Sequence, residues 1–462
     1  MKRILSSTFF VLASLLLIQP SATAQDVRTI TLQEAIDIAL ENNYQLKQAK
    51  NNLDLANADI KSEYADFLPS VSGSFGGSRT SGQQFVEDLV SFVDVTSKGM
   101  SGRVGAQLTI FDGFNNINSL RQSQQAKLSY EEQVQRAREE VIFNTASRYL
   151  QVLLDIELLE IAKQNLENST KQLEQVQAQV EVGSRPTVDL YNQEAQVAND
   201  ELSVTQQENS LKFSKLVLIR QLQIDPLGEY EFETPAVESQ VQKSINATYN
   251  INELIDQALL NRSDLKSEIA NIKSLQYQLK IAQGSLYPTI SASADISSRY
   301  SDQYAIRNEN DEFVEVDFSD QFFDQQVNRS IGFSINVPIF QNWNRMNSIQ
   351  SAKIQLKNAE LSYDNSKLQV IQEVAQAYND YTSYVKQLDA AEKSLRASEK
   401  AFETQQERYN VGSSTLIELS DAQASYVTAQ SDYTQAIFNL IFQEKLLDYY
   451  LGKLNGETVS FN

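Results

Sequence analysis

Two stretches of the chain decide the fold: VEVGSRPTVDLYNQEAQ at residues 180–196 and YNVGSSTLIELSDAQ at residues 409–423. Each contains a Val-Gly-Ser turn, and each places a carboxylate and a leucine at the same distance beyond it, with the matched positions 229 residues apart. Long runs without Pro or Gly flank both turns. Because these runs are rich in helix-forming residues and glycine commonly ends helices, the sequence predicts two helix–turn–helix hairpins.

The similarity extends outward from the two turns and predicts a tandem repeat. TLQEAIDIALENNYQLK at 31–47 matches NINELIDQALLNRSDLK at 250–266, and LPSVS at 68–72 matches YPTIS at 287–291, both at a shift of 219 positions. From IFDGF against IFQNW onward the shift is 229, so the second copy has a ten-residue insertion. We therefore expect a first structural repeat at 25–243 and a second at 244–462, with segment 226–243 and the C-terminal tail as corresponding pieces.

Uninterrupted segments rich in Ala, Leu, Gln, Glu and Lys predict six helices: Arg28–Leu68, Phe114–Val182, Thr187–Asp225, Ser244–Gln283, Trp343–Val411 and Ser413–Leu451. Two of them have nearly 70 residues, or about 100 Å of helix. The first long one has small or apolar residues alternately three and four apart, at Leu159, Ala162, Leu166, Ser169, Leu173, Val176 and Val180. This spacing predicts a coiled-coil seam, and an ordinary two-stranded coiled coil has the same period.

Between the first and second predicted helix of each copy, apolar residues recur at every second position. Apolar side chains alternate with small or polar ones at Val71, Phe75, Val104, Ala106, Leu108 and Ile110, and again at Ile290, Ala292, Ala294, Ile296, Ile331, Phe333, Ile335 and Val337. Over about ten residues this pattern is typical of membrane-spanning β-strands, although a soluble sheet with one wet face shares it. We expect β-hairpins at about 67–112 and 286–341, with Thr80–Lys98 and Ser301–Gln326 as connecting loops.

Four aromatic residues stand where each predicted β-hairpin returns to a helix: Phe111, Phe114, Phe340 and Trp343. Aromatic side chains collect at membrane–water interfaces, so these positions predict an interfacial girdle.

The composition excludes several functional classes. Residues 1–24 have a basic start, a short apolar run and a small-residue cleavage site, which predicts a secretory signal peptide. Its removal changes the net charge from −21 to −23, and such acidity argues against a nucleic-acid partner. The chain has no His and no Cys, and it lacks GxSxG, P-loop and GxGxxG motifs. We therefore expect no catalytic residues, no cofactor and no resident metal.

Four membrane strands per chain cannot close a barrel, and an open sheet edge cannot face lipid. The chain is therefore expected to assemble with copies of itself. Two copies give eight strands, which leave little room inside, whereas three copies give twelve strands and a wider lumen. This argument favours a homotrimer over twofold or fourfold closure.

Taken in order, these features resemble the TolC-like outer-membrane factors of efflux and type I secretion systems over essentially the whole mature chain. The resemblance rests on the duplicated helix–hairpin–helix–turn–helix order, on LPSVS and YPTIS at the start of the hairpins, and on the two VGS turns. It implies an α+β membrane protein: a trimeric 12-stranded outer-membrane β-barrel, four strands per chain, continued into a long periplasmic α-helical barrel. It also implies two partners, a periplasmic adaptor (membrane fusion protein) and an inner-membrane pump of the RND or ABC type.

The same resemblance implies roles for the two tip turns, 182–187 and 411–415. The residues expected to contact the adaptor are Val182, Gly183, Ser184, Val411, Gly412 and Ser413. An alternative account gives the glycines only the role of helix caps, and both accounts can hold together.

Glu418 and Asp421 match acidic positions that form a pore constriction in the family. They are three residues apart and so share a helix face, and a trimer would bring six carboxylates together. Such a ring would favour cations and could bind divalent ions. The alternative is that Glu418 completes a capping box and Asp421 favours the positive end of the helix.

In the family, polar contacts between helices also lock the tip closed. This chain departs from that pattern at one position. Ser414 stands where the family has an arginine, whereas Arg185 occupies the equivalent slot of the first turn. Asp189 and Tyr409 match another locking pair, so closure through Asp189 and Tyr409 is expected, and Arg185 is a candidate for the missing arginine's role.

The sequence thus predicts a passive exit duct in the outer membrane with a long periplasmic extension. The competing interpretation is a periplasmic coiled-coil protein with a structural or adhesive role and a soluble sheet. Because a tube selects weakly, drugs, metal ions, siderophores and polypeptides all remain open as cargo.

Overall fold

The computed structural model describes residues 28–86, 90–234, 241–242, 244–245, 247, 249–307 and 312–454. The predicted signal peptide at 1–24 and the last residues of the C-terminal tail lie outside this part of the chain. The described chain divides into two compact units. Unit 1 comprises residues up to Lys47, Ala137–Asn261 and residues from Gln372; unit 2 comprises Gln48–Arg136 and Arg262–Ile371.

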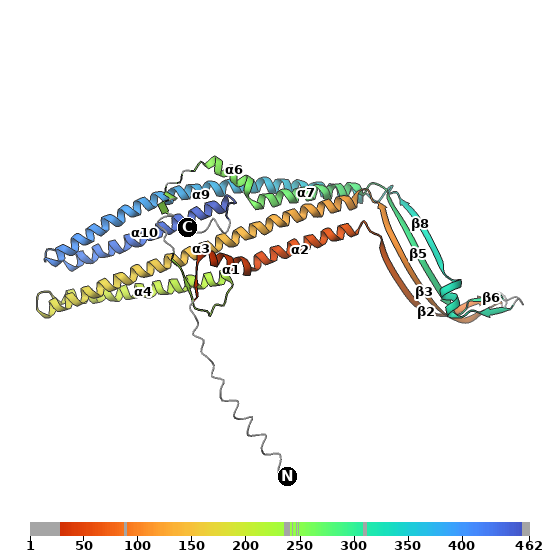
Figure 1. Ribbon diagram of the computed structural model, residues 1–462, viewed down its shortest axis with the longest axis horizontal. Coiled ribbons are helices and arrows are strands. Elements are labelled where there is room, and N and C mark those ends of the chain that lie inside the picture. Colours follow the sequence, from red (N-terminus) through yellow and green to blue (C-terminus); the bar gives the residue numbers. More distant parts are fainter. Residues whose placement is uncertain are drawn as a thin grey trace, which may run out of the picture. The chain divides into compact units, whose positions relative to one another are not determined.

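Unit 1 is built from two antiparallel helical hairpins (Figure 1). The first consists of α3 (Asn115–Glu181) and α4 (Thr187–Leu222), and the second of α9 (Asn344–Asn410) and α10 (Leu416–Tyr450). Helices α3 and α9 begin in unit 2 and end in unit 1. The shorter helices α1 (Leu32–Asn42) and α6 (Ile251–Asn261) complete the unit.

The predicted seam of α3 is its buried face in unit 1. Leu159, Ala162, Ser169 and Val176 are buried, and Leu166, Leu173 and Val180 are half-buried. The three–four spacing therefore identified the contact face correctly.

Tyr149 of α3 connects the helices to a small parallel sheet. This sheet pairs β1 (Arg28–Ile30) with β4 (Tyr230–Phe232). The fully buried Tyr149 hydroxyl donates hydrogen bonds to the carbonyl oxygens of Ile30 at 3.0 Å and Glu233 at 2.8 Å. Its ring packs edge-on against Phe232, so one side chain joins both strands to α3.

Unit 2 contains α2 (Tyr44–Ala65, which starts in unit 1), α7 (Ser263–Gly284) and a four-stranded antiparallel sheet. The strands are β2 (Ser70–Val86), β3 (Ser91–Phe111), β5 (Thr289–Ser301) and β8 (Asn328–Asn336), in the order β2-β3-β5-β8 (Figure 1). The sheet is open, so β2 and β8 are its edge strands.

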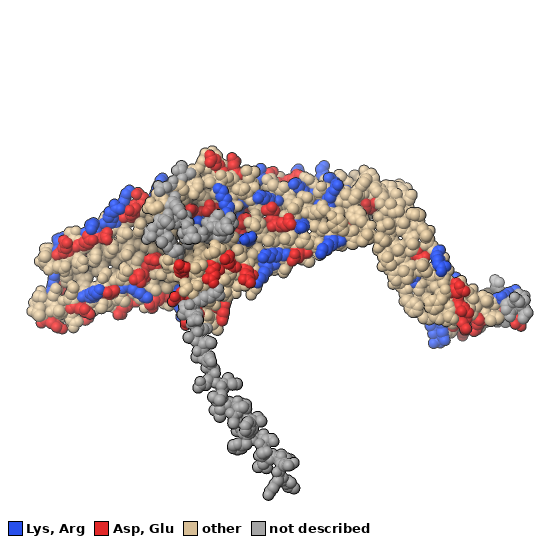
Figure 2. Space-filling view, in the orientation of Figure 1, with Lys and Arg blue, Asp and Glu red and all other residues tan. Residues whose placement is uncertain are grey.

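The strand register separates two chemically different faces of this sheet. One row contains Val71, Ala106, Ala294 and Ile331, and the adjacent rows on the same face contain Leu108, Ala292 and Phe333, and Phe111, Ile290 and Ile335. The opposite face carries rows of small or polar residues, including Ser72, Gly105, Asp295 and Ser330. The apolar face is solvent-exposed in the single chain, with Ile331 82% and Phe333 74% exposed. Figure 2 shows few charged side chains on the strands next to the helices.

Beyond this sheet, segment 301–326 contains β6 (Ala305–Arg307), β7 (Phe313–Glu315), α8 (Phe318–Asp320) and the π-helix η2 (Gln321–Gln325). The prediction that it is only a connecting loop was therefore wrong. The prediction of a loop at Thr80–Lys98 was also wrong, because β2 and β3 continue through most of it. Polar and aromatic cross-strand pairs, Ser81 with Thr96 and Phe85 with Phe92, stabilise this extension without an alternating apolar pattern.

Two of the six predicted helices are interrupted. The chain leaves the helical conformation at Asn43, whose side chain accepts a hydrogen bond from the Leu46 amide at 3.0 Å. It does so again at the buried Arg262, whose guanidinium pairs with Asp264 at 2.5 Å. Both breaks depend on side-chain contacts that average helix propensity does not capture. In the described chain, no helix is long and apolar enough to cross a membrane.

Candidate functional site: the two tip turns

The two predicted turns have nearly the same backbone. Gly183 and Gly412 have φ angles of +73° and +78°, in the left-handed region that glycine enters without a steric penalty. The amide after each glycine reaches back to the helix: Ser184 N to Gln179 O at 2.9 Å, and Ser413 N to Arg408 O at 2.8 Å. A Cβ at either glycine would meet open space, so the left-handed backbone, not crowding, requires glycine here.

Apolar side chains project from both turns. Val182 and Val411 are each 79% exposed, and Gly183, Ser184, Gly412 and Ser413 are exposed beside them. The serine hydroxyls are engaged locally, since Ser184 Oγ donates to Gln179 O and Ser413 Oγ to Arg408 O. In the single chain the six predicted adaptor-contact residues therefore form two small, exposed patches on turns held by local hydrogen bonds.

Arg185 and Tyr409 join the first hairpin to the second. The Arg185 guanidinium lies 4.4 Å from the centroid of the Tyr409 ring, and its Nη2 donates a hydrogen bond to Tyr409 O at 3.4 Å. Its Nη1 is 4.0 Å from Asp189 Oδ2. The structure thus brings three of the four predicted lock residues together, with the arginine between the other two.

Tyr409 is an anchor of the second turn. It is buried against Val176, Leu416 and Leu419, and Val180, Leu190 and Phe402 pack around this cluster. Burial raises the pKa of the Tyr409 phenol, nearby Arg185 opposes the rise, and Asp189 adds to it. Among the described residues, the Tyr409 hydroxyl has no hydrogen-bond partner, so the ring and the backbone carbonyl make this residue's contacts with Arg185.

Ser414, which the sequence analysis placed where the family has an arginine, binds the acidic residue of the helix that follows it. Its hydroxyl donates to Glu418 Oε2 at 2.7 Å, and the Thr415 amide donates to the same oxygen at 3.0 Å. The Glu418 amide in turn donates to Thr415 Oγ1 at 3.2 Å, which completes a capping box. The Ser414 hydrogen bond, followed by that of the Thr415 amide, lowers the pKa of the Glu418 carboxyl.

The two predicted constriction residues have different surroundings. Glu418 is exposed but held back towards its own turn by the capping box, whereas Asp421 is exposed one helical turn further along α10. Gln405 of α9 donates to Ser414 Oγ at 2.7 Å and connects the neighbouring helix to this cap.

A buried polar network behind the tip was missed in the sequence. Asn165 of α3 donates to Asp200 Oδ1 of α4 at 2.9 Å, and Gln423 of α10 donates to Asn165 Oδ1 at 2.8 Å. Burial raises the pKa of Asp200, against hydrogen bonds from Ser169, Gln196 and Asn165 that lower it. Ser169 within the apolar seam was the available signal. The network links both hairpins.

The four predicted interface aromatics lie where unit 2 changes from sheet to helix. Phe111 and Phe114 contact each other edge-to-face at 5.2 Å between ring centroids. Phe340 and Trp343 are 75% and 70% exposed. Exposed aromatic side chains of this size are consistent with a position at the border of an apolar sheet face.

Comparison with known proteins agrees with this architecture. The family model for the outer membrane efflux protein matches residues 35–221 and 254–453. The solvent efflux pump outer membrane protein SrpC of Pseudomonas putida is 25% identical over 443 residues, covering 92% of this chain and 83% of SrpC. Two solved structures share the fold. CusC has a TM-score of 0.78, 19% identity and coverage of 91% of this chain and 92% of CusC. The Campylobacter jejuni outer membrane channel CmeC has a TM-score of 0.76, 18% identity and coverage of 92% and 88%.

The described chain has the fold of these channel structures, with paired turns at the ends of two helical hairpins. The chain belongs to the outer membrane efflux protein family. The predicted TolC-like family and the predicted outer-membrane location are confirmed, and the function is that of an efflux exit duct.

Proposed function

We propose that three copies of this chain form a 12-stranded outer-membrane barrel that continues into a periplasmic α-helical duct. The observation that carries the proposal is the open sheet of unit 2, with two free edges and one exposed apolar face. Lipid cannot satisfy the backbone groups of β2 and β8, so β2 of one chain would pair with β8 of the next. The apolar rows would then face lipid, and the serine-rich rows would line the lumen.

We also propose that the two halves of the chain are structural repeats, 25–243 and 244–462. The paired helices support this: α1 and α6 each have 11 residues, α2 and α7 each have 22, and α3 and α9 each have 67. A trimer would then present six similar hairpins.

At the tip, we propose that the exposed patches around Val182 and Val411 contact a periplasmic adaptor attached to an inner-membrane RND or ABC pump. Arg185, Tyr409 and Asp189 would hold the hairpins of one chain together in the closed state. Glu418 and Asp421 would supply the six carboxylates of the constriction. The duct conducts passively, since its contribution is an aqueous route and not a reaction.

The assembly can be tested with the cysteine-free chain, because an introduced cysteine pair is the only source of disulfides. One cysteine replaces Ser72 or Ser74 on β2, and another replaces Ser330 or Ser334 on β8. After extraction from outer membranes in detergent, at least one pair is expected to give covalent trimers under oxidising conditions, and the native mass should equal three chains. A water-soluble monomer would contradict the proposal and support the periplasmic coiled-coil alternative.

A further inference from the structure

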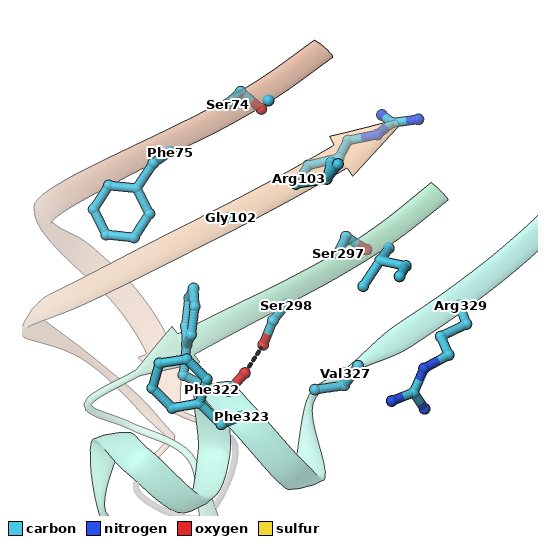
Figure 3. A pocket seen from close by; sticks show the side chains of 13 residues that line it. Ser74, Phe75, Gly102, Arg103, Ser297, Ser298, Phe322, Phe323, Val327 and Arg329 are labelled. Carbon is cyan, nitrogen blue, oxygen red and sulfur yellow. Dashed lines mark hydrogen bonds between the residues drawn. The ribbon is translucent and has the colours of Figure 1, made fainter. Parts of the chain in front are cut away.

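The apolar face of the sheet is hollowed where β8 begins, at the end of its four-stranded part and before the two-stranded extension of β2 and β3. Here a groove of about 530 Å³ is lined by residues of all four strands and of η2 (Figure 3). Its apolar walls include Phe75, Val104, Ile296, Phe322 and Phe323. This groove lies in unit 2, far along the chain from the tip turns, and none of the roles proposed above uses it.

One wall of the groove is held firmly against the sheet. The Ser298 hydroxyl donates a hydrogen bond to the Phe322 carbonyl oxygen. The nearly fully buried Gln321 accepts from the Ser301 amide at 3.1 Å and donates to Val316 O at 2.7 Å. A Cβ at Gly102 would lie 3.0 Å from the Phe322 ring, so glycine at this position allows the ring to approach the strand. The wall is therefore preformed.

The groove is also lined by one arginine side chain that makes no ion pair with any described residue. Its lining contains two arginines and no acidic residue. Arg103 is paired with Asp295 at 2.8 Å. Arg329, opposite Ile296 on the apolar face, makes no ion pair with any described residue. Asp320 and Asp324, which are near the groove in sequence, do not line it.

The position of the groove along the strands matches one border of a membrane. The rows on this face run from Ile290 to Ser298, nine residues of β5, and a tilted strand crosses a membrane with about 9–11 residues. The groove lies at the end of the four-stranded part that is farther from the helices, and β2 and β3 continue past it. In the proposed duct it therefore opens towards lipid near the outer surface. An arginine on a lipid-facing strand is tolerated near such a border and can pair there with an anionic headgroup.

We propose that this groove binds an anionic lipid, with one acyl chain against Phe75, Phe322 and Phe323 and its phosphate on Arg329. This inference rests on the proposed function, because it requires the apolar face to meet lipid. The aromatic wall supplies affinity that is independent of the headgroup. Arg329 supplies the preference for a headgroup whose phosphate charge is not balanced by a cationic group.

The test uses the full-length protein in detergent and native mass spectrometry. The probes are dimyristoyl phosphatidylglycerol and dimyristoyl phosphatidylcholine, which share acyl chains and differ in net charge. Wild type is expected to prefer phosphatidylglycerol. Arg329→Gln should reduce that preference about tenfold, the loss expected for one charge-assisted contact. Phe322→Ala should weaken both lipids and leave the preference intact.

Arg299→Gln is the matched control, because Arg299 is an exposed arginine on the opposite face of β5. Equal binding of both lipids by wild type, or the same loss in Arg299→Gln, would overturn the lipid site while leaving a conducting trimer in place. Displacement of phosphatidylglycerol by inorganic phosphate alone would also overturn it. A protein that neither forms a membrane oligomer nor binds either lipid would contradict the site and the proposed function together.

Discussion

The two tip turns share a backbone but differ in where their polar side chains bind. In the first turn, Arg185 reaches across to Tyr409 of the second hairpin, 224 residues away in sequence. In the second turn, Ser414 at the equivalent position binds Glu418, four residues away on its own helix. One turn therefore joins the hairpins and the other stabilises only its own cap. The different residues at this one position separate contact between the hairpins from capping within one hairpin.

The largest expected effect comes from the aromatic ring of Tyr409, which belongs to the second hairpin and contacts Arg185 of the first turn. Tyr409→Ala removes a buried aromatic side chain and should destabilise the tip locally by about 3 kcal/mol. Hydrogen exchange should become much faster in the last turn of α9 and the first turn of α10. Tyr409→Phe is the control, because it removes only a hydroxyl without a partner among the described residues. Equal losses in both variants would contradict the importance of the ring.

Glycine substitutions test whether the two backbones are equivalent. Gly183→Ala and Gly412→Ala should each cost about 1–2 kcal/mol, because both force a Cβ into the left-handed region while meeting no neighbour. Local hydrogen exchange at each turn measures this cost. A loss at one turn only would show that the two turns are not the same structural device.

Arg185→Gln should separate the hairpins while leaving both caps intact. The expected cost is about 1 kcal/mol, in the range of a partly exposed cation–π contact. Hydrogen exchange should increase around Tyr409 but not at the Ser184 amide. The matched variant is Arg408→Gln, because the Arg408 guanidinium donates its hydrogen bonds to Gln405 and Ser413 of the same hairpin. If Arg408→Gln loosened the hairpins equally, Arg185 would have no special role.

Ser414→Ala should have the smallest effect, a change in the pKa of the Glu418 carboxyl. Its hydroxyl is the largest cause of the lowered pKa of Glu418, so that pKa should return towards its ordinary value. A carboxyl whose pKa is lower in the folded state stabilises the fold at pH values above its unfolded-state pKa. This contribution is lost as the pH falls through the folded-state pKa. The acid side of the stability profile should therefore flatten in Ser414→Ala. NMR titration of Glu418 checks this, and an unchanged pKa would refute it.

Local chemistry explains which parts of the fold could be predicted from the sequence. The turns at 182–187 and 411–415 were located correctly because glycine at a left-handed position is a local requirement. The helix breaks at Asn43 and Arg262, the length of β2 and β3, and the structured segment 301–326 were missed because they depend on specific side-chain contacts. Arg185 was named only as a candidate for the role of the missing arginine. Its contact with Tyr409 was not predicted, because the two residues meet through packing of distant helices.

Single-channel recording tests the central claim, that this chain forms a duct with the proposed constriction of Glu418 and Asp421 at its tip. Purified wild-type protein in a planar bilayer is expected to conduct with a preference for cations and to be blocked by divalent ions. The double variant Glu418→Ala with Asp421→Ala should still conduct, but with weaker cation preference and weaker block. Unchanged selectivity would contradict the constriction, and a protein that forms no channel would contradict the duct itself.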